Sequence, residues 1–378
     1  MDEIRILHIN SYYYDGKFYK HLYDSQVNMG LQIAVYVPTY KLSDNTYDYG
    51  NYTTLSQCFN KRDRFFFHYK GEKILKNIHG RYDVKQFDII HAHSLFANGY
   101  IAYRLYKKYN IPYVVAVRNT DYNVFFKKMI HLRHLGRKIL NNASQIVFIS
   151  PSNKKLLIDN FISKSDKQSI EKKSVILPNG IENFWFTNTS SKQEPMRDNI
   201  IKIIQVGDID KNKNVLKTLA AVNHLNSNGH DTKLTVIGKI RSKRIFEKIR
   251  LNPYLNYLGY LPKEALLTHL RNNDIFILPS YKETFGLVYV EAMTQGLPVI
   301  YTKGQGFDGQ IPDFMAGLSV NPYSMLDIAQ AILSISIQYE KYSNFPPNSL
   351  HKFSWVNIAN QYLLFYNEIY NLMNKANN

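Results

Sequence analysis

Short apolar runs rich in Ile, Val, Leu and Tyr recur along this chain, with polar stretches of helix-like spacing between them. Such runs are typical of strands buried on both faces, and their alternation with helices predicts the parallel sheets of an α/β protein. In the first half, strands are expected at residues 4–10, 31–38, 87–93, 112–117, 145–150 and 174–179. In the second half, they are expected at residues 200–207, 233–238, 255–261, 274–279 and 298–302.

Two series of this kind predict two tandem doubly wound (Rossmann-like) domains. The polar stretch 187–199 has the composition of a linker, so we expect a first domain at 1–186 and a second at 200–350. Residues 351–378 carry apolar side chains at helical spacing, which predicts one long C-terminal helix packing back toward the first domain. Doubly wound sheets bind ligands at the carboxyl ends of their strands, so the site is expected in a cleft between the domains.

The chain has 378 residues and 45% hydrophobic content, enough for two cores and too much for a disordered protein. Its first residues, MDEIRILHIN, lack a basic start and turn polar after a short apolar run. This pattern argues against a signal peptide and against a membrane span. The single cysteine, Cys58, excludes an internal disulfide and fits a reducing compartment, so a cytoplasmic location is expected.

Positive charge is concentrated in the first half: residues 1–190 hold 27 Lys and Arg against 15 Asp and Glu, whereas residues 191–378 hold 20 against 15. Such a field favours nucleic acid, an anionic membrane face or an acidic substrate. The segment 123–140 mixes Phe, Met and Leu with Lys and Arg, as in a basic amphipathic helix. It predicts either peripheral docking on the inner face of an anionic membrane, or an ordinary domain helix with a solvated basic face.

The stretch PSYKETFGLVYVEAMTQGLPVI, residues 279–300, carries the most informative chemistry of the chain. It places Glu283 just before a Thr-Phe-Gly turn and Glu291 inside the helix that this turn should open. The amides of residues 285–287 are expected to be unpaired donors at the positive end of a helix dipole, which suits a phosphate. Glu291 lies too far along the helix to face a phosphate and suits a ribose diol, whereas Glu283 could reach a second sugar.

These residues resemble the retaining nucleotide-sugar glycosyltransferases of family 4, which have the two-domain GT-B fold. The resemblance rests on E-T-F-G-L-x-x-x-E-A-M-x-x-G-x-P-V-I, which follows Pro-Ser at the end of an expected strand. HAH at 91–93, PNGI at 178–181, QVGDIDKNKN at 205–214 and VIG at 236–238 occur in the family's order and extend the resemblance over most of the chain. It implies an α/β protein of GT-B fold, with two tandem Rossmann-like domains facing an interdomain cleft.

The resemblance also implies roles in the second domain. Glu291 is expected to hold the nucleotide ribose, Glu283 to contact the donor sugar, and Lys213 to neutralise the donor pyrophosphate. Further donor contacts are expected from Gly207, Lys211, Gly238, Thr284, Phe285, Gly286 and Leu287. Members of the family retain the anomeric configuration without an obvious carboxylate nucleophile, and the leaving pyrophosphate helps to deprotonate the incoming hydroxyl. The protein then contributes positioning and electrostatic stabilisation, with no metal ion or other cofactor.

In the first domain, His93 and Arg118 are expected among the catalytic residues, and Gly16, Asn119 and Asp121 on the acceptor side. Gly16 and the Asn179-Gly180 pair are also ordinary turn signals. Two histidines at 91 and 93 share one face of a strand, but no carboxylate or cysteine nearby completes a metal site. His93 is therefore expected at the cleft wall, with His91 partly buried as structure.

The loop after the first strand of the second domain departs from the family pattern. It has Gly207-Asp208 where Gly-Arg is usual, so one pyrophosphate cation is missing, and Lys211, Lys239 or Arg241 is expected to replace it. Asp208-Ile209-Asp210 also matches an Asp-x-Asp pair. The other large glycosyltransferase fold uses such a pair to bind a metal ion. Carboxylates on such a turn more often cap the following helix.

A second departure is Arg118, which stands where a histidine is common. It predicts an unusual hydroxyl pattern, or a carboxylate, on a substrate such as a uronic acid.

The sequence predicts a retaining hexosyltransferase that moves a sugar from a UDP- or GDP-sugar to a polysaccharide or lipid-linked glycan of the cell envelope. A sugar-nucleotide epimerase or hydrolase of the same architecture is the alternative within enzymes, and it would make product without an acceptor. A relative that binds nucleotide-sugar without transferring it is a further alternative. A basic nucleic-acid-binding protein is the alternative from another class, but the chain shows no recognisable nucleic-acid module, so no nucleic acid is expected among its partners.

Overall fold

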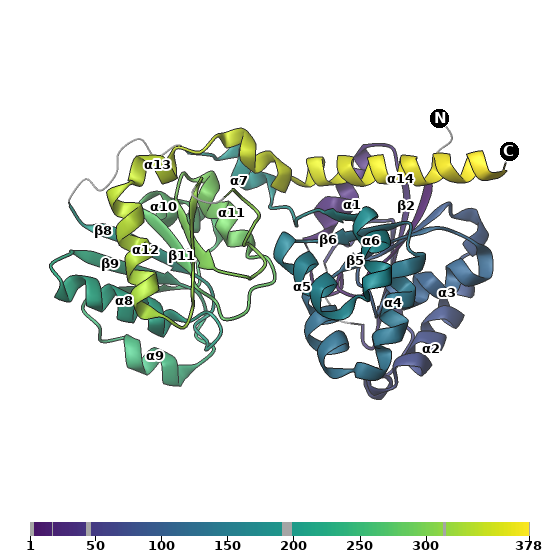
Figure 1. Ribbon diagram of the computed structural model, residues 1–378, viewed down its shortest axis with the longest axis horizontal. Coiled ribbons are helices and arrows are strands. Elements are labelled where there is room, and N and C mark those ends of the chain that lie inside the picture. The colour runs from purple at the N-terminus through teal and green to yellow at the C-terminus, as the bar shows by residue number, and fades with distance from the viewer. Residues whose placement is uncertain (1–3, 17, 43–46, 191–198, 313–314, 378) are drawn as a thin grey trace. The chain divides into compact units, whose positions relative to one another are not determined.

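The computed structural model describes residues 4–16, 18–42, 47–190, 199–312 and 315–377, which form two compact units, each with its own parallel sheet (Figure 1). Unit 1 comprises Met1–Ile149, Asn153–Gly180 and Trp355–Asn378, and unit 2 comprises Ser150–Ser152 and Ile181–Ser354. Residues 191–198 of the expected linker lie outside the described residues. The expected α/β fold class of two Rossmann-like domains is confirmed.

The sheet of unit 1 has the strand order β3-β2-β1-β4-β5-β6-β7, with all neighbouring strands parallel. The strands are β1 (Arg5–Ile9), β2 (Gln32–Thr39), β3 (Thr53–Gln57), β4 (Ile89–Ala92), β5 (Tyr113–Val117), β6 (Gln145–Phe148) and β7 (Ser174–Ile176). The helices are α1 (Tyr19–Asn28), α2 (Phe67–His79), α3 (Gly99–Tyr109), α4 (Arg133–Asn142), α5 (Pro151–Phe161), α6 (Lys164–Lys172) and α14 (Trp355–Asn377). Short helical turns are η1 (Lys61–Phe65), η2 (Val84–Gln86), the π-helical η3 (Asp121–Phe126) and η4 (Ile130–Leu132).

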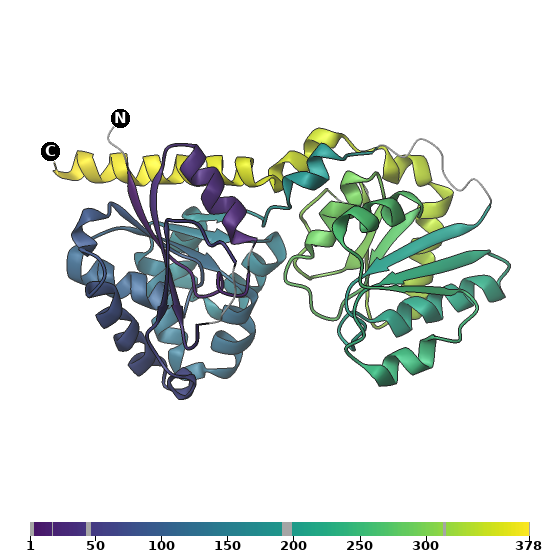
Figure 2. The ribbon, with the colours of Figure 1, turned by 180° about the vertical axis from the view of Figure 1, so that it is seen from behind.

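Two hydrophobic cores cover the two faces of this sheet because successive strand side chains point to opposite sides. Leu7 of β1 packs with the apolar stripes of α2 to α6, whereas its neighbour Ile6 packs with α1 and α14. The C-terminal helix α14 therefore completes unit 1, lying beside α1 in both views (Figures 1 and 2).

The sheet of unit 2 has the order β10-β9-β8-β11-β12-β13 and is also parallel. Its strands are β8 (Ile201–Val206), β9 (Thr232–Ile237), β10 (Leu255–Gly259), β11 (Ile275–Leu278), β12 (Val299–Thr302) and β13 (Gly317–Val320). Its helical segments are α7 (Asn183–Thr187), α8 (Val215–Ser227), α9 (Lys243–Ile249), α10 (Lys263–Arg271), α11 (Leu287–Thr294), α12 (Met325–Ile337), α13 (Tyr339–Ser343) and η5 (Pro347–Phe353). Unit 2 begins at Ile181, ahead of the expected linker, because Ile181 N bonds to Phe353 O at 2.9 Å.

The prediction of one amphipathic helix over 123–140 is wrong. The segment is divided among η3, η4 and α4. Most of its apolar side chains belong to the core of unit 1: Phe126 and Leu132 are buried, and Phe125, Met129 and Leu135 pack against them. Of its apolar side chains, Val124 and Ile130 are exposed. Among the described residues, every helix is too short or too polar to cross a bilayer.

Candidate active site

The loops that follow β8 and β11 are joined at the carboxyl edge of the unit 2 sheet. Asn212 Nδ2 donates to Lys282 O at 2.9 Å, Lys282 N donates to Asn212 Oδ1 at 3.0 Å, and Tyr281 N donates to Asn212 O at 2.9 Å. Asn214, the N-cap of α8, donates from Nδ2 to Pro279 O at 3.0 Å. Neither asparagine was expected in the site, although two asparagines flanking Lys213 directly after a strand end are a signal of such loop chemistry.

An ion pair between Lys213 and Glu283 occupies the middle of this edge. Lys213 Nζ lies 2.7 Å from Glu283 Oε2, which also accepts from Ser280 Oγ at 3.3 Å. Both side chains are partly exposed, so a ligand can reach them. The pair brings together a cation suited to phosphate and a carboxylate suited to hydroxyls. Two residues that the sequence placed at the donor thus lie in direct contact.

The helix α11 begins as the motif predicts. Its N-cap, Gly286, has φ 80°, and a Cβ there would lie 2.3 Å from the Tyr289 ring, so only glycine fits. Within the described part of the chain, the amides of Phe285 and Leu287 and that of Gly286 donate to no protein acceptor. They are free donors at a helix N-terminus, where an anion is stabilised.

The loop after β12 supports the same turn, and the sequence prediction missed it. Glu283 N donates to Gln305 Oε1 at 3.0 Å, and Gly306 N donates to Glu283 O at 3.0 Å. A Cβ on Gly306 would lie 1.8 Å from Thr284 O, so the two backbones touch. Three glycines after a strand end, in TKGQGFDG, were the available signal.

The glycines of the β8 and β9 ends have a packing role. A Cβ on Gly238 would lie 2.0 Å from Gly207 O, and Gly207 N donates to Ile237 O at 2.8 Å. The close approach of these two strand ends therefore requires glycine at position 238. Lys211 is exposed on the adjoining loop.

The two aspartates of the β8 loop have different partners. Asp208 Oδ2 lies 2.7 Å from Arg241 Nε, and Asp208 Oδ1 accepts from Lys239 N at 3.3 Å. The Arg241 guanidinium holds the pKa of the Asp208 carboxyl below its ordinary value. Asp210 Oδ1 instead accepts from Lys213 N at 2.8 Å. This arrangement supports a structural role for the aspartates rather than a shared metal ion.

Glu291 lies farther along α11, largely buried beside the ion pair of Glu182 and Lys263. Burial, with a smaller effect of the Glu182 charge, raises the pKa of the Glu291 carboxyl to about 7. The carboxyl can therefore gain or lose its proton when the pH changes near 7, or when a ligand changes its surroundings.

In unit 1, Asp121 ties the loop after β5 to the loop after β4. Its Oδ2 accepts from Leu95 N at 3.0 Å and from Arg118 N at 2.8 Å, and its Oδ1 accepts from Phe96 N at 3.1 Å. Burial raises the pKa of this carboxyl to about 6, against the opposing effect of the three amides. Both oxygens face the protein interior, which favours a structural role for Asp121, and its expected contact with the acceptor stays a prediction. Its neighbour Asn119 is half-buried and accepts from Asn123 Nδ2.

Arg118 is held in a fixed position by neutral groups. Its Nε donates to His93 O at 3.1 Å, its Nη1 donates to Asn179 Oδ1 at 3.2 Å, and its Cζ lies 5.7 Å from the Tyr19 ring centre. The side chain is half-buried, and among the described residues no carboxylate forms an ion pair with its guanidinium. The Asp121 carboxylate stabilises this cation without an ion pair to the guanidinium, so an anionic group of a ligand can still pair with it.

Three buried histidines lie together beneath this edge. His8 Nδ1 lies 3.0 Å from His93 Nε2, and the Tyr366 hydroxyl of α14 lies 2.7 Å from His91 Nδ1. Burial lowers the pKa of His8 to about 3 and the pKa of His91 and His93 well below the ordinary value. The expected position of His93 at a cleft wall is wrong, since its imidazole is fully buried.

The same three histidines have ligand atoms within 4.8 Å of one another, and the third member, His8, was not expected. The rings of His91 and His93 are stacked with centroids 4.1 Å apart at 19°. Nearly parallel rings direct their in-plane lone pairs side by side rather than at one point, which is unfavourable for a shared ion. The cluster therefore acts as packing between β1, β4, α1 and α14.

The glycines of unit 1 also have local structural reasons. Gly16 N donates to Tyr12 O at 2.7 Å, which closes the turn after β1. A Cβ on Gly180 would lie 2.5 Å from the indole of Trp355, the first residue of α14. Only glycine therefore fits at position 180.

Two family profiles match this chain. The profile described as Glycosyltransferase Family 4 covers residues 16–183, and the profile described as Glycosyl transferases group 1 covers residues 186–351. Together they include most of both units.

Curated relatives are similar at low identity. The alpha-monoglucosyldiacylglycerol synthase of Acholeplasma laidlawii is 25% identical over 62% of this chain and 63% of that enzyme. The D-inositol 3-phosphate glycosyltransferase of Corynebacterium kroppenstedtii is 25% identical over 72% of this chain and 65% of that enzyme. The match thus spans slightly less than two thirds of the length of each of these relatives.

Solved structures share the fold. Sucrose-phosphate synthase from Thermosynechococcus elongatus has a TM-score of 0.74 and 18% identity, covering 98% of this chain and 100% of that chain. Anabaena Alr3699/HepE, solved in complex with UDP and glucose, has a TM-score of 0.66 and 14% identity, covering 97% of this chain and 100% of that chain. At these identities the likeness shows the architecture alone.

Proposed function

We propose that this protein, which belongs to the group 1 glycosyltransferases and has their GT-B fold, moves a sugar from a nucleotide-activated donor to a glycan acceptor. The donor would be a UDP- or GDP-sugar, and the acceptor a polysaccharide or a lipid-linked glycan of the cell envelope. The observation that carries this proposal is the Lys213–Glu283 pair, 2.7 Å apart, beside three free amides at the start of α11.

In this proposal the donor occupies the carboxyl edge of unit 2. The amides of residues 285–287 and the Lys213 ammonium bind the pyrophosphate, and the transferred sugar reaches the Glu283 carboxylate. Glu291 accepts the ribose hydroxyls farther along α11. When a phosphate of the donor binds the Lys213 ammonium, the ion pair between Lys213 and Glu283 breaks. The Glu283 carboxylate can then accept hydrogen bonds from sugar hydroxyls.

The missing cation of the β8 loop is supplied by Arg241. Asp208 holds the Arg241 guanidinium at 2.7 Å, so the aspartate fixes a cation from the β9 loop beside Gly207. A guanidinium that bonds a carboxylate through Nε keeps its terminal nitrogens for a phosphate.

The proposed chemistry is transfer with retention and without a metal ion. The protein would position both substrates and stabilise the charge of the departing nucleotide through Lys213, Arg241 and the α11 amides. The leaving phosphate would accept the proton of the incoming hydroxyl, since the carboxylates of the site serve as hydroxyl ligands.

Arg118 would select an anionic substrate group, such as the carboxylate of a uronic acid. Within the described part of the chain, its guanidinium donates hydrogen bonds to neutral oxygens, at 3.1 and 3.2 Å. Arg118→Gln should then lower kcat/KM for uronic substrates and leave neutral ones nearly unchanged. Equal turnover of uronic and neutral substrates by the unaltered protein would refute this selectivity.

The test of the function is incubation with a panel of nucleotide-sugars, with and without glycan acceptors. Acceptor-dependent product that keeps the donor's anomeric configuration by NMR, and that forms in the presence of a strong chelator, supports the proposal. Product from the donor alone would instead support the hydrolase or epimerase. Donor binding without any product would indicate a relative that no longer transfers.

A further inference from the structure

Three aromatic side chains of unit 1 are exposed within five residues of sequence. Phe65 is 83% exposed, Phe66 65% and Tyr69 56%, at the end of η1 and the start of α2. Scattered exposed apolar residues are normal, but a contiguous aromatic group marks an interaction surface. We call Lys61, Arg62, Arg64, Phe65, Phe66 and Tyr69 the η1–α2 surface.

The exposure is built into the fold. Asp63 is buried and caps the turn by accepting from Asn60 N at 2.7 Å, and Lys70 N donates to Phe66 O at 2.9 Å. The opposite side of α2 lies in the core, where a Cβ on Gly71 would be 2.4 Å from the Tyr100 ring. The helix is thus fixed with its aromatic start facing solvent.

The charge of the η1–α2 surface is positive throughout. Lys61, Arg62 and Arg64 are exposed. Asp63, the only acid from residue 61 to 70, is buried and paired with Lys73 Nζ at 2.8 Å. Glu72, the exposed acid three residues after Tyr69 on α2, is paired with Arg104. An aromatic group beside three exposed cations fits an anionic surface.

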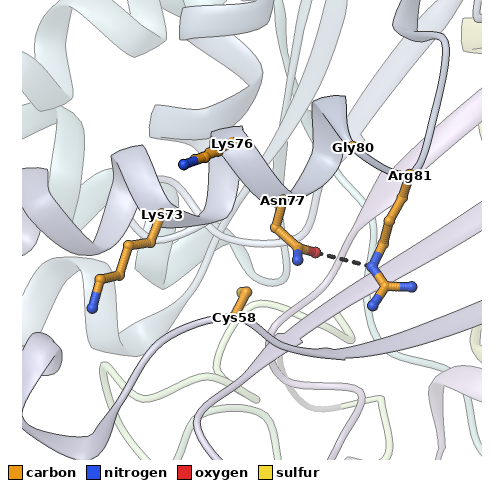
Figure 3. Close-up of a pocket in the computed structure, with 6 residues that line it drawn as sticks. All are labelled: Cys58, Lys73, Lys76, Asn77, Gly80 and Arg81. Carbon is orange, nitrogen blue, oxygen red and sulfur yellow. Dashed lines mark hydrogen bonds between the residues drawn. The ribbon is translucent and has the colours of Figure 1, made fainter.

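Cations continue along α2 from this surface. Tyr69, Lys73 and Lys76 follow one another at i, i+4 and i+7, so they form one stripe of the helix, and Lys73 Nζ lies 4.5 Å from the Tyr69 ring centre. The stripe ends at a hollow of about 520 Å³ lined by Cys58, Lys73, Lys76, Asn77, Gly80 and Arg81 (Figure 3). Arg81 Nε donates to Asn77 Oδ1 at 3.1 Å, which fixes the guanidinium at the rim (Figure 3).

We propose that the η1–α2 surface docks on a bilayer that contains anionic phospholipid. The aromatic rings would enter the headgroup boundary, and the cations of the surface and of the hollow would pair with lipid phosphates. Exposed rings suit a lipid interface, because lipid adapts its shape to them.

The position of the surface agrees with membrane delivery of an acceptor. η1 follows the carboxyl end of β3, so the surface lies at the edge of the sheet that also carries the loops of Gly16 and Arg118. The docking is independent of transfer activity. Only the delivery of a lipid-linked acceptor rests on the proposed function.

Flotation with vesicles of phosphatidylcholine alone, or mixed with phosphatidylglycerol, tests the docking. The protein should float with the mixed vesicles at low salt, at least about tenfold more than with neutral ones, and lose binding at high salt. Phe65→Ser/Phe66→Ser and Arg62→Gln/Arg64→Gln should each reduce this binding about tenfold. Their melting temperatures should match the unaltered protein, because all four side chains are exposed.

Matched controls separate this surface from general stickiness. Lys107→Gln/Lys108→Gln removes the same charge as the arginine variant from exposed residues at the end of α3, and Leu251→Ser removes an apolar side chain that is 79% exposed in unit 2. Both should bind mixed vesicles like the unaltered protein. Equal flotation on neutral and mixed vesicles, or unchanged flotation of the aromatic variant, would overturn the proposal. Binding of single-stranded RNA in place of vesicles, unaffected by the aromatic variant, would assign the cations to nucleic acid and overturn it too.

Discussion

The carboxyl edges of the two sheets are built in opposite ways. In unit 2, backbone and asparagine hydrogen bonds join the loops, and Lys213, Glu283 and the α11 amides remain accessible. In unit 1, the polar groups beneath the edge are buried: Asp121 bonds three amides and His91 bonds Tyr366. The second ring nitrogens of the three histidines have no hydrogen-bond partner among the described residues. The difference teaches that unit 2 leaves its charged groups accessible to a ligand, whereas unit 1 buries its polar groups inside the fold.

The largest expected effect is that of a methyl group at the β12 loop. Gly306→Ala places a Cβ 1.8 Å from Thr284 O, so the turn that carries Glu283 must move, and transfer should fall more than about 100-fold. Gly304→Ala is the matched control, because it has φ 74° and open space around it. It should cost only about 1 kcal/mol of unfolding free energy. Similar transfer rates for the two variants would show that the β12 loop does not position Glu283.

The ion pair should matter for binding rather than for folding. Lys213→Met should lower kcat/KM about 100-fold and weaken nucleoside diphosphate binding, because the pyrophosphate loses its cation. Glu283→Gln should lower kcat with little effect on nucleotide affinity. Urea unfolding should change by at most about 1 kcal/mol in either variant, since the pair is partly exposed. A large loss of stability would make the pair structural and break the contrast between the units.

Glu291 should show opposite effects on stability and binding. Burial raises the pKa of the Glu291 carboxyl to about 7, from 4.5 in the unfolded chain. Between these two pH values the folded protein keeps a proton that the unfolded chain loses. The free energy of unfolding therefore falls as the pH rises from 4.5 to 7. Glu291→Gln should therefore stabilise the protein at pH 8, by up to about 3 kcal/mol, and have little effect near pH 4. The same variant should bind nucleotide about tenfold more weakly at pH 8. Thermal melts across pH and calorimetric titration check both effects.

Arg241 and Asp208 should behave as one unit toward the donor. Arg241→Gln and Asp208→Asn should each weaken nucleoside diphosphate binding about five- to tenfold, and the double variant should be no weaker than either alone. Additive losses in a calorimetric double-mutant cycle would show that Asp208 does not act by holding Arg241.

The smallest expected effect is in unit 1. Tyr366→Phe removes the 2.7 Å contact with His91 Nδ1 and should lower the unfolding free energy by about 1 kcal/mol. Nucleotide affinity should stay unchanged, because the cluster is buried structure. Altered donor binding in this variant, measured by calorimetry, would contradict the separation of roles.

The sequence predicted the two-domain fold, whereas the donor site in unit 2 stays a prediction. Strands with buried apolar runs were found, but β3 (Thr53–Gln57) and β13 (Gly317–Val320) were missed, because TTLSQ and GLSV are short and partly polar. The motif at 279–300 located Glu283 and the start of α11 because strand, turn and helix follow one another locally.

The remaining features depend on contacts between distant segments. Gln305 meets Glu283 across 22 residues, and Tyr366 meets His91 across 275. His93 was placed at a cleft wall because strand periodicity gives its face but not what covers that face. Helix α14 covers it, together with α1. No local pattern states which helix packs on which strand.

The most direct test of the central claim is a thermal-shift measurement with nucleoside diphosphates and nucleotide-sugars on the unaltered protein and on Lys213→Met. A ligand at 100 times its Kd stabilises the folded state by about 2.7 kcal/mol, which is a shift of several degrees for a protein of this size. We expect at least one uridine or guanosine diphosphate to raise the melting temperature of the unaltered protein, with the shift largely lost in Lys213→Met. Absence of a shift with every nucleotide, or an undiminished shift in Lys213→Met, would contradict a donor site at the edge of unit 2.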